Sequence, residues 1–376
     1  MSKQIDISII SSGANLADAR LHRLTRALLR AGLSVEVFAP GFLQDAPQVE
    51  SAQQTLEIRS PWFNAAWHNT GLIPRYYRSR IFALRSRGRV LYAISPEAVA
   101  PSYAVAKLRG RKFAVDLFED YLQLLHDRAW AKKFFGIVGW IAKSDTRSAL
   151  WFSERADLTT VADVQVPPLK AHNRLVVRNL PENSLLSQSG QRDSVPRAIY
   201  IGDLRASRGL KNMLRVAQIS PRWEFDFVGG IAPADQEFVD KWVQENDPGR
   251  SRIRFHGKLP LSTSWSYAVG AWVGLCLLEP TPAFMEAIPS KLYEYMSVGL
   301  ASISTPLPRC VELHRVSNFG AIEPSPEAVA MRLEYWRMNP DELDQIRLNV
   351  ELWASKNLDS EREYFNFAAE MMKLTR

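Results

Sequence analysis

The sequence predicts an α/β protein built from two Rossmann-like, doubly wound domains. Short apolar segments with the composition of buried strands alternate with helical patterns along most of the 376 residues. A polar stretch rich in Ser, Gln, Asn and Pro interrupts this alternation once, after which it resumes. The length suits two cores of roughly one to two hundred residues each. Alternating strands and helices form parallel sheets covered by helices on both faces.

The N-terminal domain, placed at residues 1–185, begins with the strand-like segment IDISIISSG, in which Asp6 interrupts any secretory apolar region. Leu21, Leu24 and Leu28 then recur at helical spacing before Gly32. The expected later strands are SVEVFAP, RVLYAIS, KFAVDLF, DLTTVA and RLVVRN, with helices over PEAVAPSYAVAKLRG and residues 130–156 between them. This order predicts a parallel sheet.

The second domain is placed at residues 197–358, after a predicted linker at residues 186–196 that shows neither helical nor strand periodicity. Its expected strands are RAIYIGD, EFDFVGG, RIRFHGK, WVGLCLL, LASIST and FGAIEP. Amphipathic patterns predict helices over residues 340–357 and 360–375. The last of these makes up a separate C-terminal segment, residues 359–376.

Composition excludes several classes of protein. The only two cysteines, Cys276 and Cys310, form neither a disulfide framework nor a CxxC pair, and no zinc-ligand cluster is visible. No apolar stretch approaches the ~18–20 residues that span a bilayer. We therefore expect a cytoplasmic protein without a transmembrane helix and without a bound metal or other cofactor.

The net charge of +7 is unevenly distributed. Residues 1–185 hold 25 basic and 16 acidic residues, a net +9, whereas residues 186–376 hold 22 and 24, a net −2. Residues 73–112 contain ten basic residues and a single acidic one, Glu97. An anionic partner should therefore meet this segment first. Nucleic acid is excluded as that partner because no recognition motif accompanies the charge.

The segment IPRYYRSRIFALRSRGR, residues 73–89, allows two interpretations. A basic helix with aromatic residues suits peripheral contact with an anionic membrane at its inner face, with Arg75, Tyr76, Arg78 and Arg85 as the contact candidates. An ordinary helix that buries its apolar side and leaves its arginines in water explains the same pattern.

Two segments of the second domain have the properties of an anion and sugar site. YIGDLRASRG combines a strand end, close approach at Gly202 and the cations Arg205 and Arg208. In EAIPSKLYEYM, Glu286 and Glu294 flank an expected helix start. Carboxylates can accept paired hydrogen bonds from vicinal hydroxyls, while a helix N-terminus binds phosphate. Together the segments predict a nucleotide-sugar site.

The same residues carry a family resemblance. The chain resembles the retaining family-4 glycosyltransferases, in the subgroup with the pattern P-x-K-x-x-E-Y-M-x-x-G, here Pro289, Lys291, Glu294, Tyr295, Met296 and Gly299. DARLHRLTRALLRAGLSVEVF, ERADLTTVA and YIGDLRASRG resemble further segments of that family, so the likeness runs from Asp18 to Thr305. It implies a GT-B fold, in which two Rossmann-like domains face each other and the C-terminal helix crosses back to the first.

The resemblance also implies residue roles. Glu286 would contact the hydroxyls of the donor sugar, Glu294 the ribose, and Arg208 and Lys291 the diphosphate, with Gly13 beneath that diphosphate. The further donor-binding candidates are Gly202, Arg205, Ser290 and Leu292. The implied reaction is metal-independent transfer of a sugar, with retained configuration, from a UDP or GDP sugar to a membrane-linked or cell-envelope glycan.

Two positions depart from the family pattern. Asp203 stands where the family has Arg, and Phe118 stands where the pattern D-x-H-[DE], here Asp116 to Glu119, has His. His126 is a candidate to replace that histidine, so Asp116, Phe118, Glu119 and His126 are the acceptor-side candidates. Two alternatives stay open: a UDP-sugar 2-epimerase of the same fold, and a nucleotide-sugar-binding protein with impaired catalysis.

Overall fold

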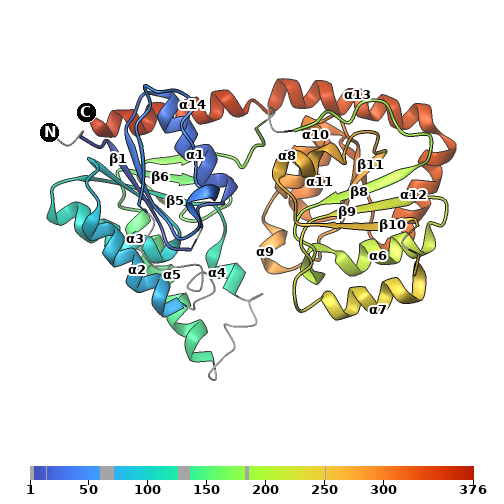
Figure 1. Cartoon of the computed structure of the whole chain (residues 1–376), viewed down its shortest axis with the longest axis horizontal. Helices are drawn as coiled ribbons and strands as arrows, with labels where there is room; N and C mark the ends of the chain where they lie inside the picture. The colour runs from blue at the N-terminus through green and yellow to red at the C-terminus, as the bar shows by residue number, and fades with distance from the viewer. Residues whose placement is uncertain (1–3, 14, 60–71, 126–135, 183–185, 250) are drawn as a thin grey trace. The chain divides into compact units, whose positions relative to one another are not determined.

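The computed structural model describes residues 4–13, 15–59, 72–125, 136–182, 186–249 and 251–376. They form two compact units: unit 1 comprises Met1–Asn179 together with Glu361–Arg376, and unit 2 comprises Leu180–Ser360. Each unit is a parallel sheet with helices on both faces (Figure 1). Among the described helices, none combines the length and apolarity needed to cross a bilayer.

The sheet of unit 1 has seven strands in the order β3-β2-β1-β4-β5-β6-β7, and every pair is parallel. The strands are β1 Ile7–Ser11, β2 Val35–Phe38, β3 Leu56–Ile58, β4 Val90–Ile94, β5 Lys112–Leu117, β6 Leu158–Val161 and β7 Arg174–Val176. The chain runs outward in one direction from β1 and then in the other from β4. This reversal makes the β1/β4 junction the switch point where doubly wound sheets bind ligands.

The helices of unit 1 form two layers. They are α1 Ala19–Arg30, α2 Leu72–Arg85, α3 Pro96–Leu108, α4 Tyr121–Leu124, α5 Ile137–Ser153 and α14 Ser360–Thr375. On one face of the sheet α1 and α14 contribute Leu24, Leu28 and Phe367 to the core. On the other face the core includes Phe82 of α2, Val99 of α3 and Ala149 of α5. Alternate strand residues point to each layer, as the two-residue period of a strand requires.

The C-terminal helix α14 completes unit 1. Its buried residues Phe367 and Met371 join the apolar core beside α1, and the ring of Phe367 lies 5.7 Å from that of Tyr92 in β4. The guanidinium of Arg178 donates to the Glu363 carboxylate over 2.8 Å. The last helix thus returns to the unit formed by the first half of the chain.

Unit 2 repeats the same topology with six parallel strands in the order β10-β9-β8-β11-β12-β13. Its strands are β8 Arg197–Ile201, β9 Glu224–Val228, β10 Ile253–Gly257, β11 Val273–Cys276, β12 Ser302–Ser304 and β13 Gly320–Ile322. Its helices are α6 Leu210–Ile219, α7 Gln236–Asn246, α8 Leu261–Ser266, α9 Pro282–Met285, α10 Ser290–Ser297, α11 Pro308–Ser317, α12 Pro326–Met338 and α13 Pro340–Asn357. The switch point lies between β8 and β11.

The segment predicted as a linker, residues 186–196, has no helix or strand, and it lies against unit 2. The buried guanidinium of Arg347 in α13 donates to the Ser189 hydroxyl and the Gly190 carbonyl. Arg192 forms two hydrogen bonds with the Asp344 carboxylate. These contacts fix the segment to α13 although it lacks the periodicity of a regular element.

Candidate functional site

The switch point of unit 2 gathers most of the donor-site residues. Gly202 follows β8 with φ 150°, and a Cβ atom there would lie 2.8 Å from Cε of Lys291. Lys291 lies in the first turn of α10, so the absence of a side chain at position 202 lets this lysine approach the end of β8. Gly209 is equally constrained, because its Cβ would lie 1.7 Å from the carbonyl oxygen of Leu277.

Lys291 and Glu294 are paired directly. The ammonium Nζ of Lys291 lies 2.6 Å from Oε2 of Glu294, one turn along α10, and both side chains are mostly buried. The helix N-terminus at Ser290 adds the partial positive charge of its free N–H groups. Lys291 therefore orients one oxygen of Glu294 and leaves Oε1 for another donor.

Arg208 reaches the same place from the other side of the loop. Burial raises the pKa of Tyr200 to about 12, an effect that the neighbouring Arg208 opposes. Burial also raises the pKa of Cys276 at the end of β11, and after Cys310 the groups acting on this thiol are Lys291, Arg208 and Glu294. The charges of three residues from two distant segments of the sequence thus act on one strand end.

Asp203, the residue that departs from the family pattern, engages both arginines of its loop. Its carboxylate accepts a hydrogen bond from Arg205 over 2.8 Å and lies 3.9 Å from Arg208. Burial alone would raise the pKa of Asp203, but Arg208 and Arg205 outweigh it and hold the pKa below its ordinary value. Arg205 is therefore paired with Asp203 in this structure.

Two other donor-site candidates lie differently. Glu286 follows α9 as an exposed residue, and it makes no hydrogen bond or ion pair with the residues that the structure describes. Leu292 buries its side chain in the core of unit 2, and its amide donates to the carbonyl of Pro289. The structure brings Gly202, Arg208, Lys291 and Glu294 together, and it does not join Glu286 or Leu292 to them.

The acceptor-side candidates of unit 1 include a buried ion pair. Arg20 of α1 makes two hydrogen bonds of 2.7 Å to the Asp116 carboxylate, and Thr160 donates a third over 2.6 Å. Both partners are almost completely buried, so the Asp116 carboxylate is not open to a ligand. The guanidinium of Arg20 also lies 5.6 Å from the ring of Phe118. Glu119 is exposed, and His126 lies outside the described residues.

The switch point of unit 1 holds polar side chains that were not predicted as site residues from the sequence. Ser12 and Gly13 follow β1, while Ser95 and Glu97 follow β4, and the register that pairs Ser11 with Ile94 sets them side by side. A Cβ on Gly13 would lie 3.3 Å from the Cβ of Ser95 and 3.4 Å from Oε2 of Glu97. We call these four residues the unit 1 polar cluster.

Several polar atoms of the unit 1 polar cluster are unsatisfied. Within the described residues, the hydroxyls of Ser12 and Ser95 and the Oε2 atom of Glu97 are buried without a hydrogen-bond partner. Ser95 also has φ 111°, which is rare for a residue with a side chain and marks strain that functional sites often retain. The sequence signal was available: a strand ending in Ser-Pro-Glu at a switch point.

Cations and a second carboxyl group surround this cluster. Arg75 lies 3.8 Å from Oε1 of Glu97, and the buried Arg78 donates to the Ser12 carbonyl over 3.4 Å. Burial, with a further contribution from Glu97, raises the pKa of Asp145 in α5 to about 7. Arg78 was predicted at a membrane surface, but it faces inward because it meets the end of β1.

Asp145 gives a testable pH dependence. Its pKa is higher in the folded protein than its ordinary value of 3.8, so the folded state binds more protons between about pH 4 and about pH 7. The stabilising contribution is present at low pH and is lost as the pH rises through 7, by at most about 4 kcal/mol. In urea unfolding at a series of pH values, the free energy of unfolding should decline less with rising pH in Asp145→Asn than in the wild type. In Glu97→Gln the decline should be intermediate. Equal slopes in all three proteins would contradict this assignment.

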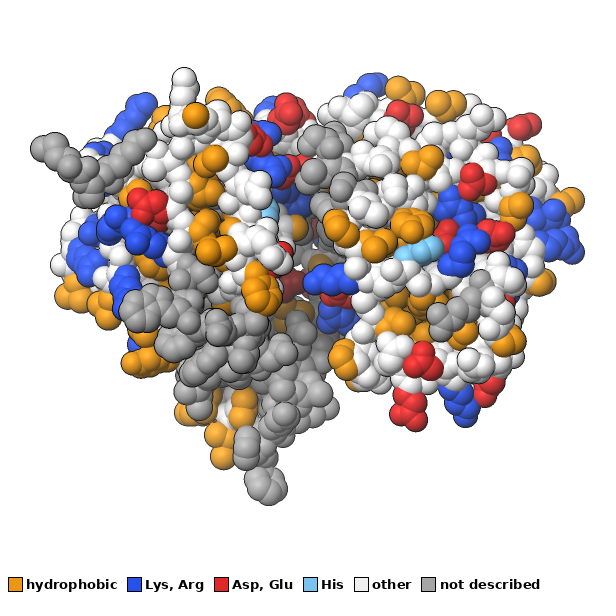
Figure 2. Space-filling model, in the orientation of Figure 1, with side chains coloured by type: hydrophobic (Ala, Val, Ile, Leu, Met, Phe, Trp, Pro, Cys, Tyr) orange, Lys and Arg blue, Asp and Glu red, His pale blue; other side chains and the backbone are white. Residues whose placement is uncertain are grey.

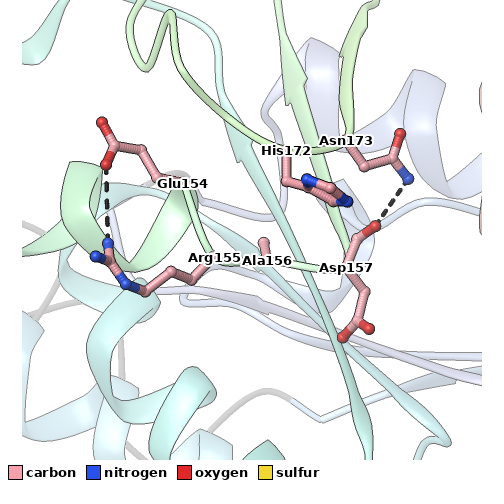
Figure 3. A pocket seen from close by; sticks show the side chains of 6 residues that line it. All are labelled: Glu154, Arg155, Ala156, Asp157, His172 and Asn173. Carbon is pink, nitrogen blue, oxygen red and sulfur yellow. Dashed lines mark hydrogen bonds and ion pairs between the residues drawn. The ribbon is translucent and has the colours of Figure 1, made fainter.

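The hollow drawn in Figure 3 lies where strands β6 and β7 of unit 1 begin, at the end of the sheet opposite to the switch point. It is lined by Glu154, Arg155, Ala156, Asp157, His172 and Asn173. Asp157 and Asn173 immediately precede β6 and β7, and the amide of Asn173 donates to the Asp157 carbonyl over 2.8 Å. Since doubly wound sheets bind ligands at the carboxyl ends of their strands, we do not place the functional site in this hollow.

Comparison with solved structures identifies the fold. No protein-family model and no curated protein matches the chain. Among solved structures, sucrose-phosphate synthase from Thermosynechococcus elongatus matches with a TM-score of 0.74 at 14% identity, over 99% of each chain. The fold is GT-B. The fold class predicted from the sequence is thereby confirmed.

Two further matches also cover the whole chain. HepE from Anabaena, in complex with UDP and glucose, has a TM-score of 0.69 at 15% identity, over 99% of this chain and 100% of that one. A glycosyltransferase from Rickettsia africae has a TM-score of 0.64 at 12% identity, over 99% of this chain and 100% of that one.

Within the described residues, no three His, Cys, Asp or Glu side chains gather as metal ligands.

Proposed function

We propose that this protein transfers a glycosyl group from a nucleoside-diphosphate sugar, of the UDP or GDP type, to a membrane-linked or cell-envelope glycan. The observation that carries the proposal is the grouping of Lys291, Glu294 and Arg208 at the switch point of unit 2. HepE, which shares the fold, was solved with UDP and glucose. The proposal includes retained anomeric configuration and a cytoplasmic, metal-independent reaction.

The donor is held by charge and by the helix terminus. The N-terminus of α10, Lys291 and Arg208 supply positive potential for a diphosphate. Gly202 leaves the space in which Lys291 lies. Glu294, oriented by Lys291, accepts hydrogen bonds from ribose hydroxyls, and Glu286 takes those of the transferred sugar.

The chemistry follows from the same charges. The bond between the anomeric carbon and the diphosphate oxygen breaks, and its electron pair stays on the nucleoside diphosphate. A new bond forms between that carbon and an acceptor hydroxyl oxygen, whose proton is released. Lys291 and Arg208 stabilise the negative charge that develops on the leaving group, which is the largest single contribution in many enzymes.

Three residues of the unit 1 polar cluster, Ser12, Ser95 and Glu97, are our candidates for the acceptor side, while Gly13 stays a donor-side candidate. Buried serine hydroxyls and a carboxylate with an unsatisfied oxygen suit the hydroxyl groups of a sugar. Glu97 is the group of this cluster that could accept a hydrogen bond from a hydroxyl of a bound acceptor. Asp116 is assigned no such role, because Arg20 and Thr160 occupy its carboxylate.

The function can be tested without knowing the acceptor. The purified protein is incubated with UDP and GDP sugars, and the products are followed by NMR. We expect slow hydrolysis of one donor that first releases the sugar anomer of the donor itself. Release of the opposite anomer would contradict retention, and conversion into another nucleotide sugar would identify an epimerase. Nucleotide binding without any turnover would identify a protein with impaired catalysis.

Glu294 provides the matching variant test. Glu294→Ala removes charge-assisted hydrogen bonds of about 1.5–3 kcal/mol, so kcat/KM for the donor should fall roughly 10- to 150-fold. The exposed carboxylate of Glu245 in α7 gives a control, Glu245→Ala, which should react like the wild type. Unchanged kcat/KM in Glu294→Ala would remove this residue from the donor site.

A further inference from the structure

Unit 1 presents an outer surface of exposed apolar, aromatic and basic side chains. On the side away from the sheet, α3 packs between α2 and α5. The residues exposed there are Tyr77, Arg80 and Leu84 of α2, Lys107 and Leu108 of α3, and Ile137, Trp140, Ile141, Arg147 and Trp151 of α5. We call these residues the outer helix face. Hydrophobic side chains are visible along the lower edge of unit 1, near where these helices lie (Figures 1 and 2).

The exposed residues of α5 form one continuous stripe. With the exposed Ser144 between them, Ile137, Trp140, Ile141, Arg147 and Trp151 are linked by steps of three or four residues, which place side chains on one side of a helix. Trp140 is 69% exposed, and the guanidinium of Arg155 lies 3.7 Å from the ring centre of Trp151. Water-exposed tryptophans are costly, and such apolar patches usually mark an interaction site.

The charge of the outer helix face has a single sign. The sequences of α2, α3 and α5 contain only two carboxylates, Glu97 and Asp145. Glu97 is buried beside Gly13, and Asp145 is partly buried with a raised pKa, so neither neutralises the exposed cations. The opposite layer of unit 1 is different, because there Arg26 and Arg30 of α1 are paired with Glu50.

We propose that the outer helix face is a docking surface for an anionic lipid bilayer. Tryptophan rings settle at the headgroup level of a membrane, and flanking arginines and lysines are drawn to anionic headgroups. The combination of exposed Trp140 and Trp151 with exposed cations, Arg80, Lys107 and Arg147, that form no ion pair among the described residues favours this partner over an acidic protein. The inference rests on the proposed function only in that a membrane-linked acceptor would lie at the membrane to which the outer helix face binds.

The residues of the outer helix face differ from the membrane-contact candidates named from the sequence. Of the four candidates named from the sequence, Arg78 is buried and Arg75 lies 3.8 Å from Glu97, so neither belongs to the outer helix face, whereas Arg85 at the end of α2 is exposed. Arg80 and Tyr77, which share the helix α2 with them, face outward instead. Four of the seven exposed apolar residues of the outer helix face, Ile137, Trp140, Ile141 and Trp151, belong to α5.

Co-sedimentation of the full chain with vesicles tests the proposal. Vesicles of phosphatidylcholine alone are compared with vesicles of equimolar phosphatidylcholine and phosphatidylglycerol. We expect binding to the anionic vesicles only, with a blue shift of tryptophan fluorescence. Trp140→Ser/Trp151→Ser should abolish the blue shift and weaken binding at least tenfold. Arg80→Glu/Arg147→Glu should weaken it by about fivefold or more for each cation lost.

The controls separate this inference from the proposed function. Lys241→Glu alters an exposed cation on α7 of unit 2 and should bind vesicles like the wild type. All variants should keep the wild-type melting temperature, and if the tryptophan variant does not fold, the arginine variant still decides. Equal sedimentation of wild type and variants, or no binding to anionic vesicles, would overturn the proposal. Donor hydrolysis is measured on the same samples, so loss of one property without the other shows which inference fails.

Discussion

Lys291→Ala should reduce donor turnover by about 10²- to 10³-fold in kcat, the usual cost of removing one group that stabilises a leaving-group charge. The lysine lies at the start of α10, within reach of the end of β8, and holds Glu294 by a 2.6 Å ion pair. Its removal takes away a cation and frees the carboxylate it orients. Hydrolysis of the preferred nucleotide sugar, followed at saturating donor, measures the effect.

Lys291→Arg and Lys241→Ala complete this test. The arginine keeps the charge but is larger. Because a Cβ atom on Gly202 would already lie 2.8 Å from Cε of Lys291, the space beside residue 291 is tight, and only partial activity should return. Lys241 on α7 is exposed, and its removal should leave turnover unchanged. A Lys291→Ala protein that folds and keeps wild-type kcat would exclude Lys291 from leaving-group stabilisation.

Asp116→Ala should destabilise the protein by about 3–5 kcal/mol, because it leaves the Arg20 guanidinium buried without its carboxylate. Burial by itself lowers the pKa of Arg20, but the charge and hydrogen bonds of Asp116 outweigh this effect and raise the pKa above its ordinary value. The guanidinium therefore stays charged in the core. For a unit of this size the expected fall in melting temperature is on the order of 10 °C. Thermal unfolding followed by circular dichroism gives the value.

A double-mutant cycle identifies the cause of this loss. Arg20→Met/Asp116→Ala removes both charges and should recover part of the stability lost in the single variant. The exposed pair of Lys112 and Asp157 gives the control, since Lys112→Met should cost less than about 1 kcal/mol. A loss below 1 kcal/mol for Asp116→Ala would show that Asp116 is not a structural residue and would reopen its role on the acceptor side.

The fold could be predicted because its signals are local. Alternating apolar runs marked the strands, and helical periodicity predicted residues 340–357 and 360–375, where α13 and α14 lie. The Pro-x-Lys segment predicted the start of α10 because proline and a free helix terminus have fixed geometric requirements. These features depend on neighbours in the sequence and need no knowledge of distant contacts.

The candidate site was less predictable because its contacts are distant in sequence. Asp116 followed a family pattern, yet Arg20, 96 positions earlier, takes its carboxylate. The sequence around Arg78 is typical of a surface cation, yet its guanidinium donates to the Ser12 carbonyl just after β1. In the sequence Glu97 is only the single acid of a basic segment. It lies close to Gly13 because β1 and β4 pair in the sheet, which no local pattern indicates.

The central claim is that unit 2 binds a nucleoside diphosphate through Lys291, Glu294 and Arg208. Isothermal titration of the full chain with UDP and with GDP tests it most directly, comparing the wild type with Arg208→Ala and with the exposed control Arg222→Ala. We predict that one nucleotide binds the wild type and the control, and that Arg208→Ala weakens its Kd at least tenfold. Binding of neither nucleotide, or equal affinity in Arg208→Ala, would contradict the account.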